Sequence, residues 1–317
     1  MAEHALIELD AQYRQLREEC GLLDRGDRGK LLVTGPEAAE YLQGQLTNDV
    51  EALEPGEGQY AALLDRKGHM QADMRVLRLE TGEIWIDTEP EAVAAAGRHL
   101  QMYKVGREVE VADVGAERTI LSLIGPRSAE IAGTAVLPEH ANEATAVAGT
   151  ECIAIGTGPG IDLIAAATEA GRLREALLNA GAVEVSAAAA EILRIESGVP
   201  RYGAEMGTET MPAEAGIVEA AVSFTKGCYI GQETVARLHY KGRPNRHLRG
   251  LRLSAPASPG AGLRLNEKEV GRLGSSCVSP VLGPIGLAIV RREAEPGTEL
   301  AVGEDGVTAE VVDLPFG

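Results

Sequence analysis

The chain has 317 residues, which is enough for two or three domains and for a sizeable buried core. Its 48 acidic and 30 basic residues give a net charge of -18, which argues against nonspecific binding to nucleic acids or anionic membranes. Aromatic residues make up only 3% of the sequence, so Ala, Val, Leu and Ile must form the core. An RNA-stacking surface is therefore disfavoured.

The four cysteines, Cys20, Cys152, Cys228 and Cys277, lie far apart and form no C-x-x-C pair. This spacing argues against a disulfide framework, a zinc site or an iron–sulfur site in this chain. The six histidines show no ligand spacing either, so we expect no bound metal. The N-terminal segment lacks the features of a signal peptide, and no stretch is long and apolar enough to span a membrane. These features favour the cytoplasm.

In chain order, an amphipathic helix is expected over residues 5–20, followed by a unit that occurs twice. In the first copy, a buried strand at 30–34 leads through Gly35-Pro36 into a helix at 37–42. Residues 119–132 repeat the strand, the Gly-Pro pair and the helix. Strands and a helix follow each copy, at 60–64, 70–79, 84–87 and 93–102 and then at 152–155, 161–167 and 173–178. This repetition predicts a duplicated α/β core with a ligand cleft where its halves meet.

The glycine-rich stretch at 156–160 suggests a phosphate-binding loop at first sight. Its spacing fits neither G-x-G-x-x-G nor a Walker motif, and strand-forming residues resume at Ile161. We therefore expect a hairpin turn there.

Residues 194–203 follow a helical run at 187–193 and contain a glycine and a proline that end it. Glu196 is therefore expected at a helix end beside a loop. The helix dipole disfavours an acid in a last turn, so either simple exposure or a specific partner accounts for this glutamate.

The octet Lys226-Gly227-Cys228-Tyr229-Ile230-Gly231-Gln232-Glu233 combines a cation, a thiol, an amide and a carboxylate. Its two glycines favour a loop, and residues 233–238 are compatible with the first turn of a helix. A thiol near a lysine and upstream of a helix N-terminus is stabilised as the thiolate, which would make Cys228 reactive. A lone cysteine is as often a small buried hydrophobe, so local chemistry leaves both alternatives open.

Beyond residue 244 the composition changes to short β-like runs separated by Gly and Pro, at 248–253, 269–277, 284–290 and 307–312. This pattern predicts a small antiparallel β-barrel. We expect one domain, or two subdomains, over residues 1–244 and the barrel over 245–317.

The octet matches at all eight positions the K-G-C-[FY]-x-G-Q-E signature of the YgfZ family. These are folate-binding proteins related in fold to the T-protein (aminomethyltransferase) of the glycine cleavage system. The resemblance implies a duplicated mixed α/β core of the folate-binding type with a C-terminal β-barrel. Further segments that resemble the superfamily lie at 41–50, 63–68, 193–198 and 210–216.

The resemblance also implies a folate site. Glu196 matches the glutamate that holds the pterin ring, and a carboxylate can accept parallel hydrogen bonds from the 2-amino group and ring N–H. We assign Tyr202 and Gln232 to the same ligand, tetrahydrofolate. Cys228, Lys226 and Asp73 are the candidate catalytic residues.

A basic run follows the octet in this acidic chain, and it is either a solvated connection or an anion site. If it binds an anion, the glutamate tail of folate is the one most consistent with a pterin site, and we assign Arg243 and Arg246 to it. The run comprises Arg237, His239, Lys241, Arg243, Arg246, His247, Arg249 and Arg252.

The sequence departs from the T-protein at two places. The acidic pair of that family appears here as Ala72-Asp73, and its R-x-G-Y-T-G-E-x-G-x-E stretch is absent around Gly156. The first expectation is therefore a YgfZ-type protein that acts, with Cys228 as its functional thiol, in the maintenance of iron–sulfur proteins and through them in tRNA modification. The alternative is a folate-dependent aminomethyl or one-carbon transferase. Iron–sulfur proteins are the expected clients, and neither nucleic acid nor membrane is an expected partner.

Overall fold

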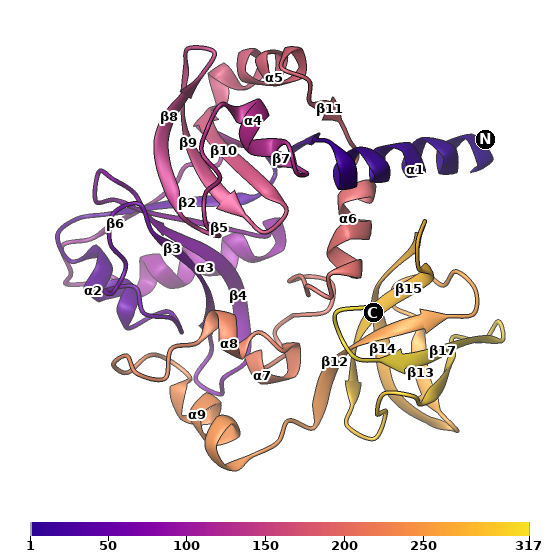
Figure 1. The fold of residues 1–317 in the computed structure, drawn as a ribbon. Coiled ribbons are helices and arrows are strands. Elements are labelled where there is room, and N and C mark those ends of the chain that lie inside the picture. The colour runs from indigo at the N-terminus through magenta and orange to yellow at the C-terminus, as the bar shows by residue number, and fades with distance from the viewer. Residues whose placement is uncertain (1, 317) are drawn as a thin grey trace. The chain divides into compact units, whose positions relative to one another are not determined.

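The computed structural model describes the backbone of residues 2–316 and the side chains of residues 8–316 (Figure 1). It divides into two units. The N-terminal unit comprises the residues up to Leu64, Gln71–Ala189 and Ala220–Ile230. The C-terminal unit comprises Asp65–Met70, Ala190–Glu219 and the chain from Gly231 onward.

The N-terminal unit begins with helix α1 (Ala2–Glu18) and contains two sheets. The first sheet has the order β3-β4-β5-β2-β6. Its helix α3 packs on β2 and β6. The elements are β2 (Gly29–Thr34), α2 (Ala38–Gln43), β3 (Gly58–Leu64), β4 (Met70–Arg78), β5 (Ile84–Thr88), α3 (Pro90–Tyr103) and β6 (Glu110–Asp113).

The second sheet has the order β11-β1-β7-β10-β9-β8, and helices α4 and α5 pack on its strands β10 and β7. Its elements are β1 (Gly21–Asp24), β7 (Arg118–Ile124), α4 (Ser128–Ala132), β8 (Asn142–Val147), β9 (Thr150–Thr157), β10 (Gly160–Ala166), the 3-10 helix η1 (Ala167–Glu169), α5 (Ala170–Asn179) and β11 (Val183–Glu184). Strands β8, β9, β10 and β7 repeat the order of β3, β4, β5 and β2, which agrees with the predicted duplication, although strand β8 was not predicted.

The glycine of the repeated Gly-Pro pair has the same physical role in both copies. Gly35 and Gly125 have φ values of 109° and 131°, which favour glycine. A Cβ at Gly35 would lie 2.2 Å from the carbonyl oxygen of Glu108, and one at Gly125 would lie 2.4 Å from that of Glu19. Each glycine thus lets the strand end pass close to another backbone segment, which supports the duplication.

Apolar side chains from both sheets form one buried cluster inside the N-terminal unit. Leu77 and Trp85 come from the first sheet, and Ile120 and Ile164 come from the second. Trp85 is the only tryptophan of the chain and is 2% exposed. Burial of this apolar surface stabilises the association of the two halves.

The C-terminal unit contains a closed six-stranded antiparallel barrel with the order β12-β15-β14-β13-β16-β17. The predicted barrel is confirmed, and two further short strands, β13 and β16, complete it. Its strands are β12 (Arg246–Leu253), β13 (Gly262–Leu265), β14 (Lys268–Ser279), β15 (Gly283–Arg291), β16 (Glu299–Val302) and β17 (Val307–Val312). Leu251, Leu273 and Leu300 are among the buried residues that fill the barrel.

Four helices contain or flank the motifs of interest: α6 (Ala187–Glu196), α7 (Pro212–Ala215), α8 (Val218–Ala221) and α9 (Gln232–Lys241). Glu196 is the last residue of α6, as predicted. The expected hairpin turn in the glycine-rich stretch is also confirmed, because β9 and β10 pair antiparallel up to Thr157 and Gly160.

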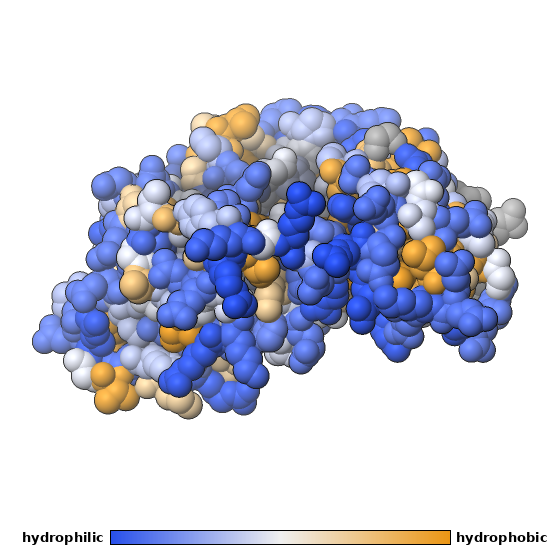
Figure 2. All heavy atoms as spheres, turned by 90° about the horizontal axis from the view of Figure 1, so that it is seen from below, coloured by the Kyte–Doolittle hydropathy of each residue, from blue (hydrophilic) through white to orange (hydrophobic). Residues whose placement is uncertain are grey.

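Hydrophilic side chains cover most of the face seen in Figure 2, and apolar side chains form small separate patches on it. This distribution is ordinary for a chain with 25% charged residues. Among the described helices, none combines the length and apolar character that crossing a membrane requires.

Candidate functional site

Asp73 lies on β4 in the N-terminal unit and is 8% exposed. Its Oδ2 accepts a hydrogen bond of 2.6 Å from the hydroxyl of Tyr60 on β3. Its Oδ1 is buried and has no hydrogen-bond partner among the residues that the structure describes. A buried acceptor without a donor is costly, so this oxygen is suited to a ligand that brings one.

Burial raises the pKa of the Asp73 carboxyl, although the hydrogen bond from Tyr60 opposes this effect. Nearby Glu89 raises the pKa further, and Arg28 lowers it. Burial and the Asp73 charge also raise the pKa of Tyr60, so the tyrosine is the proton donor of the pair. A raised pKa makes this carboxyl a better proton acceptor than an ordinary aspartate.

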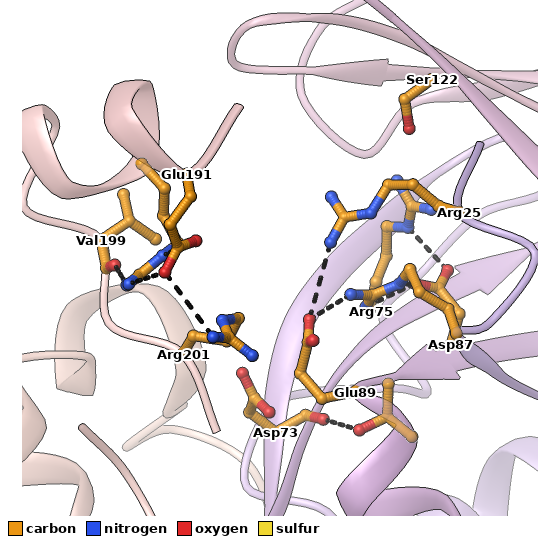
Figure 3. A network of polar contacts seen from close by, with 12 residues as sticks. Arg25, Asp73, Arg75, Asp87, Glu89, Ser122, Glu191, Val199 and Arg201 are labelled. Atoms are coloured by element: carbon orange, nitrogen blue, oxygen red, sulfur yellow. Dashed lines mark hydrogen bonds and ion pairs between the residues drawn. The ribbon is translucent and has the colours of Figure 1, made fainter. Parts of the chain in front are cut away.

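Asp87 on the neighbouring strand β5 has a different environment (Figure 3). Its two oxygens accept hydrogen bonds from Arg28 and Arg75, both at 2.8 Å, and from the Trp85 indole at 3.1 Å. Burial alone would raise its pKa, but Arg75 and Arg28 lower it to about 2. Asp87 is therefore held as a carboxylate whose acceptors are in use.

Arg75 extends this network to the second sheet. Its Nη1 lies 2.7 Å from Oδ2 of Asp162 on β10, and the other Asp162 oxygen accepts a 2.6 Å hydrogen bond from Ser122 on β7. The network joins the two halves of the N-terminal unit through charged groups that are almost completely buried. The pairing of both aspartates with buried or partly buried arginines indicates a structural role.

Lys226, the first residue of the octet, is 8% exposed. Its ammonium donates to the carbonyl oxygens of Gln43, Leu46 and Asn48 at 2.6, 2.7 and 2.9 Å. It also lies 5.2 Å from the ring centroid of Tyr229. Burial lowers the pKa of Lys226 to about 8. The lysine thus anchors the octet to residues 43–48, and its three donors are used by backbone acceptors.

Cys228 is exposed, whereas Cys20 and Cys152 are buried and Cys277 is partly buried. All four cysteines, which lie within the described residues, are free thiols. The next helix, α9, begins at Gln232, with Gly231 before it in the left-handed region. The anchored backbone next to Cys228 presents its thiol to solvent. The catalytic roles of Cys228, Lys226 and Asp73 remain predictions.

Glu196 lies in the C-terminal unit, at the end of α6. Its Oε1 accepts a 2.6 Å hydrogen bond from the hydroxyl of Ser279 at the end of β14. A carboxylate oxygen has two acceptor positions, so this bond is compatible with pterin donors on the same group. The pterin-binding role of Glu196 stays a prediction.

A partly buried ionic network fixes the chain around Glu196. Arg194 donates to Glu191, to Glu205 at 3.1 Å and to the Ser275 hydroxyl at 2.6 Å. Glu205 also accepts the backbone N–H of Arg201 at 3.0 Å. Figure 3 shows the ion pair between Arg201 and Glu191, whose atoms lie 3.6 Å apart. These contacts hold the loop that follows α6 against the end of the helix.

The other predicted folate-binding residues also lie in the C-terminal unit, in varied settings. Tyr202 is buried and forms an isolated bridge with Met206, and Gln232 is the first residue of α9. Arg243 is exposed. Arg246 makes a bidentate ion pair with Glu214, at 2.9 and 2.7 Å, so much of its hydrogen-bonding capacity serves this contact.

Sequence reasoning missed two residues that contact candidate site residues, Tyr60 and Ser279. The expected strands around Tyr60 and Asp73 form one hairpin, and pairing them would have suggested that contact. Ser279 is 83 residues from Glu196, and no local pattern signals their hydrogen bond. In the described part of the chain, no cluster of three His, Cys, Asp or Glu side chains could hold a metal ion.

The comparisons with known proteins agree over nearly the whole chain. Residues 6–226 match the GCVT N-terminal domain, and residues 246–316 match the glycine cleavage T-protein C-terminal barrel domain. An aminomethyltransferase of Rubrobacter xylanophilus is 31% identical, over 97% of this chain and 86% of the relative. One of Listeria welshimeri is 30% identical, over 97% of this chain and 89% of the relative.

A solved structure gives the same result. The crystal structure of the glycine cleavage system aminomethyltransferase T of Bartonella henselae is similar, with a TM-score of 0.88 and 25% identity. The match covers 98% of this chain and 89% of that one. The chain therefore belongs to the glycine cleavage T-protein family.

Proposed function

We propose that this protein binds tetrahydrofolate and takes part in one-carbon chemistry. The observation that carries the proposal is the Asp73 carboxyl: one oxygen is held by Tyr60, and the other is buried with no partner in the described part of the chain. Such an oxygen could accept a hydrogen bond from an N–H group of a reduced pterin. Separately, the sequence resemblance assigns Glu196 to a pterin, and a carboxylate is suited to the 2-amino and ring N–H groups of that ring.

For the activity, the relatives named aminomethyltransferase support transfer of an aminomethyl or other one-carbon unit. Tetrahydrofolate would supply the nitrogen nucleophiles that take up the carbon. Asp73, as a carboxylate with a raised pKa, would accept a proton at its Oδ1, and Tyr60 would keep the carboxyl oriented. The family pattern has a second acid where this chain has the buried Ala72. Asp73 would therefore act without that acid.

A second candidate function is favoured by the exposed thiol of Cys228. In a YgfZ-type protein this thiol would serve the maintenance of iron–sulfur client proteins and, through them, tRNA modification. The anchoring of Lys226 by three carbonyl groups supports this candidate, because it fixes the backbone from which Cys228 projects. The free thiols fit a cytoplasmic location.

Two experiments separate the candidates. Purified protein with tetrahydrofolate and an aminomethylated lipoyl carrier should release ammonia if it is an aminomethyltransferase. In cells that lack the endogenous homologue, Cys228→Ser should abolish complementation if the thiol carries the function. For tetrahydrofolate binding itself, Glu196→Gln should cost about 1–3 kcal/mol of affinity in calorimetry, because one pterin donor loses its acceptor.

A further inference from the structure

Three side chains on one face of β14 contact or pack near the end of α6, and all of them lie within the C-terminal unit. Ser275 accepts a hydrogen bond from Arg194, Cys277 belongs to the apolar cluster around Ile195, and Ser279 donates to Glu196. Residues two apart on a strand point to the same side, so these three form one row. The barrel therefore supplies polar contacts to the segment that holds the candidate pterin ligand.

The direction of the Ser279 hydrogen bond follows from its surroundings. Ser279 is 2% exposed, and its oxygen accepts the backbone N–H groups of Val281 and Leu282 at 3.1 and 2.9 Å. With these bonds on its lone pairs, the hydroxyl has its single proton for Glu196, whose Oε1 lies 2.6 Å away. Both backbone contacts fix the serine oxygen, so it is a rigid donor.

The negative charge of Glu196 has a further effect in this row. Burial raises the pKa of Cys277 to about 12, and the charges of Glu196 and Glu191 contribute to the increase. Cys277 is therefore kept as a neutral thiol beside the carboxylate. In this row, Ser279 is the residue that contacts Glu196 through a charge-assisted hydrogen bond.

We propose that Ser279 is a positioning residue for tetrahydrofolate recognition: it holds the Glu196 carboxylate in the orientation that receives the pterin. This inference rests on the proposed function. A glutamate side chain that is held in place before the ligand arrives loses less conformational freedom on binding. The barrel would thus contribute to affinity without a direct contact between Ser279 and the ligand.

The test is calorimetric titration of the full-length protein with tetrahydrofolate. Ser279→Ala should weaken binding about tenfold, as expected for losing a hydrogen bond to a charged group. Ser279→Thr, which keeps the hydroxyl, should restore most of the affinity. Ser276→Ala is the matched control. Ser276 lies on the same strand and donates a 2.6 Å hydrogen bond to the carbonyl of Ala257, so its loss should change affinity less than twofold.

A positioning role predicts a result that a general loss of stability does not predict. In a Glu196→Ala background, Ser279→Ala should cause no additional loss of affinity, because the group that it positions is gone. Should Ser279→Ala not fold, Ser279→Cys, a weaker donor of similar size, should give an intermediate loss. Thermal unfolding of each variant verifies that it is folded.

The outcomes separate the two proposals. Equal affinities of the wild type and Ser279→Ala, or an undiminished effect in the Glu196→Ala background, would overturn the positioning role and leave tetrahydrofolate binding intact. A wild-type protein that does not bind tetrahydrofolate would overturn the proposed function and the positioning role with it.

Discussion

Asp73 and Asp87 are two buried aspartates on neighbouring strands, and their surroundings push their pKa values in opposite directions. Asp87 accepts hydrogen bonds from Arg28, Arg75 and Trp85, and its pKa is lowered to about 2. Asp73 accepts one hydrogen bond from a tyrosine, its other oxygen has no partner among the described residues, and its pKa is raised.

This difference separates a structural carboxylate from a candidate functional one. Burial alone does not distinguish the two, since both are nearly inaccessible to solvent. The two aspartates differ in how many of their acceptor positions are occupied by hydrogen bonds. A buried acid that is fully paired stabilises the fold, whereas one with an open acceptor is costly unless a ligand completes it.

The largest expected effect comes from breaking the paired aspartate. Asp87→Asn should lower the free energy of unfolding by about 3–5 kcal/mol, because Arg28 and Arg75 lose the carboxylate that they share. Asp73→Asn should leave the stability at pH 7 unchanged or raise it. Urea denaturation of the two variants measures both values, and similar losses would contradict the comparison.

The pH dependence of stability sharpens the same comparison. The folded-state pKa of Asp87 is lowered from 3.8 to about 2, so its stabilisation is present above pH 3.8 and is lost as the pH falls toward 2. By linkage it amounts to about 2–3 kcal/mol.

Asp73 has the opposite sign. Its raised pKa gives stability that is present below pH 3.8 and is lost as the pH rises through the folded-state value. We therefore expect the free energy of unfolding of Asp87→Asn to fall less than that of the wild type between pH 7 and pH 2. For Asp73→Asn, the cost of burying a charged carboxylate at neutral pH should be absent. Identical profiles for the two variants would refute this assignment.

The sequence predicts the local motifs of this protein but not its buried ionic network. The duplicated Gly-Pro pairs, the barrel and the helix end at Glu196 could be predicted, because each depends on local spacing. The network could not, because Arg28 and Asp162 are 134 positions apart by residue number and no periodic pattern links them. The octet likewise gave no sign that Lys226 is bound by carbonyl groups of residues 43–48.

Lys226 and Cys228 show a similar contrast with smaller expected effects. The Lys226 ammonium is buried and fully hydrogen-bonded, whereas the Cys228 thiol is exposed. Lys226→Met should cost about 1–3 kcal/mol of stability, because buried carbonyl oxygens lose their donor. Cys228→Ser should change the stability by less than about 0.5 kcal/mol, as expected for an exposed residue. Thermal denaturation measures both, and iodoacetamide should label Cys228 before the other cysteines. Faster labelling of Cys20 or Cys277 would contradict the exposure argument.

The smallest expected effect concerns the basic residues after the octet. Arg243 is exposed, whereas Arg246 is paired with Glu214, so we expect Arg243 to contribute more to binding a folate tail. Polyglutamylated tetrahydrofolate should bind more tightly than the monoglutamate, by about 0.2–1 kcal/mol per exposed contact, and salt should erode the difference. Arg243→Ala should reduce it. Equal affinities at low ionic strength would assign these residues another role.

The central claim is that the open oxygen of Asp73 receives a donor from tetrahydrofolate. Calorimetric titration of the wild type and of Asp73→Asn with tetrahydrofolate tests it most directly, because the variant keeps the size of the side chain and removes the charge. We predict that the wild type binds and that Asp73→Asn loses about 1–3 kcal/mol of affinity while remaining folded. Equal affinities of the two proteins, or no binding by the wild type, would contradict the claim.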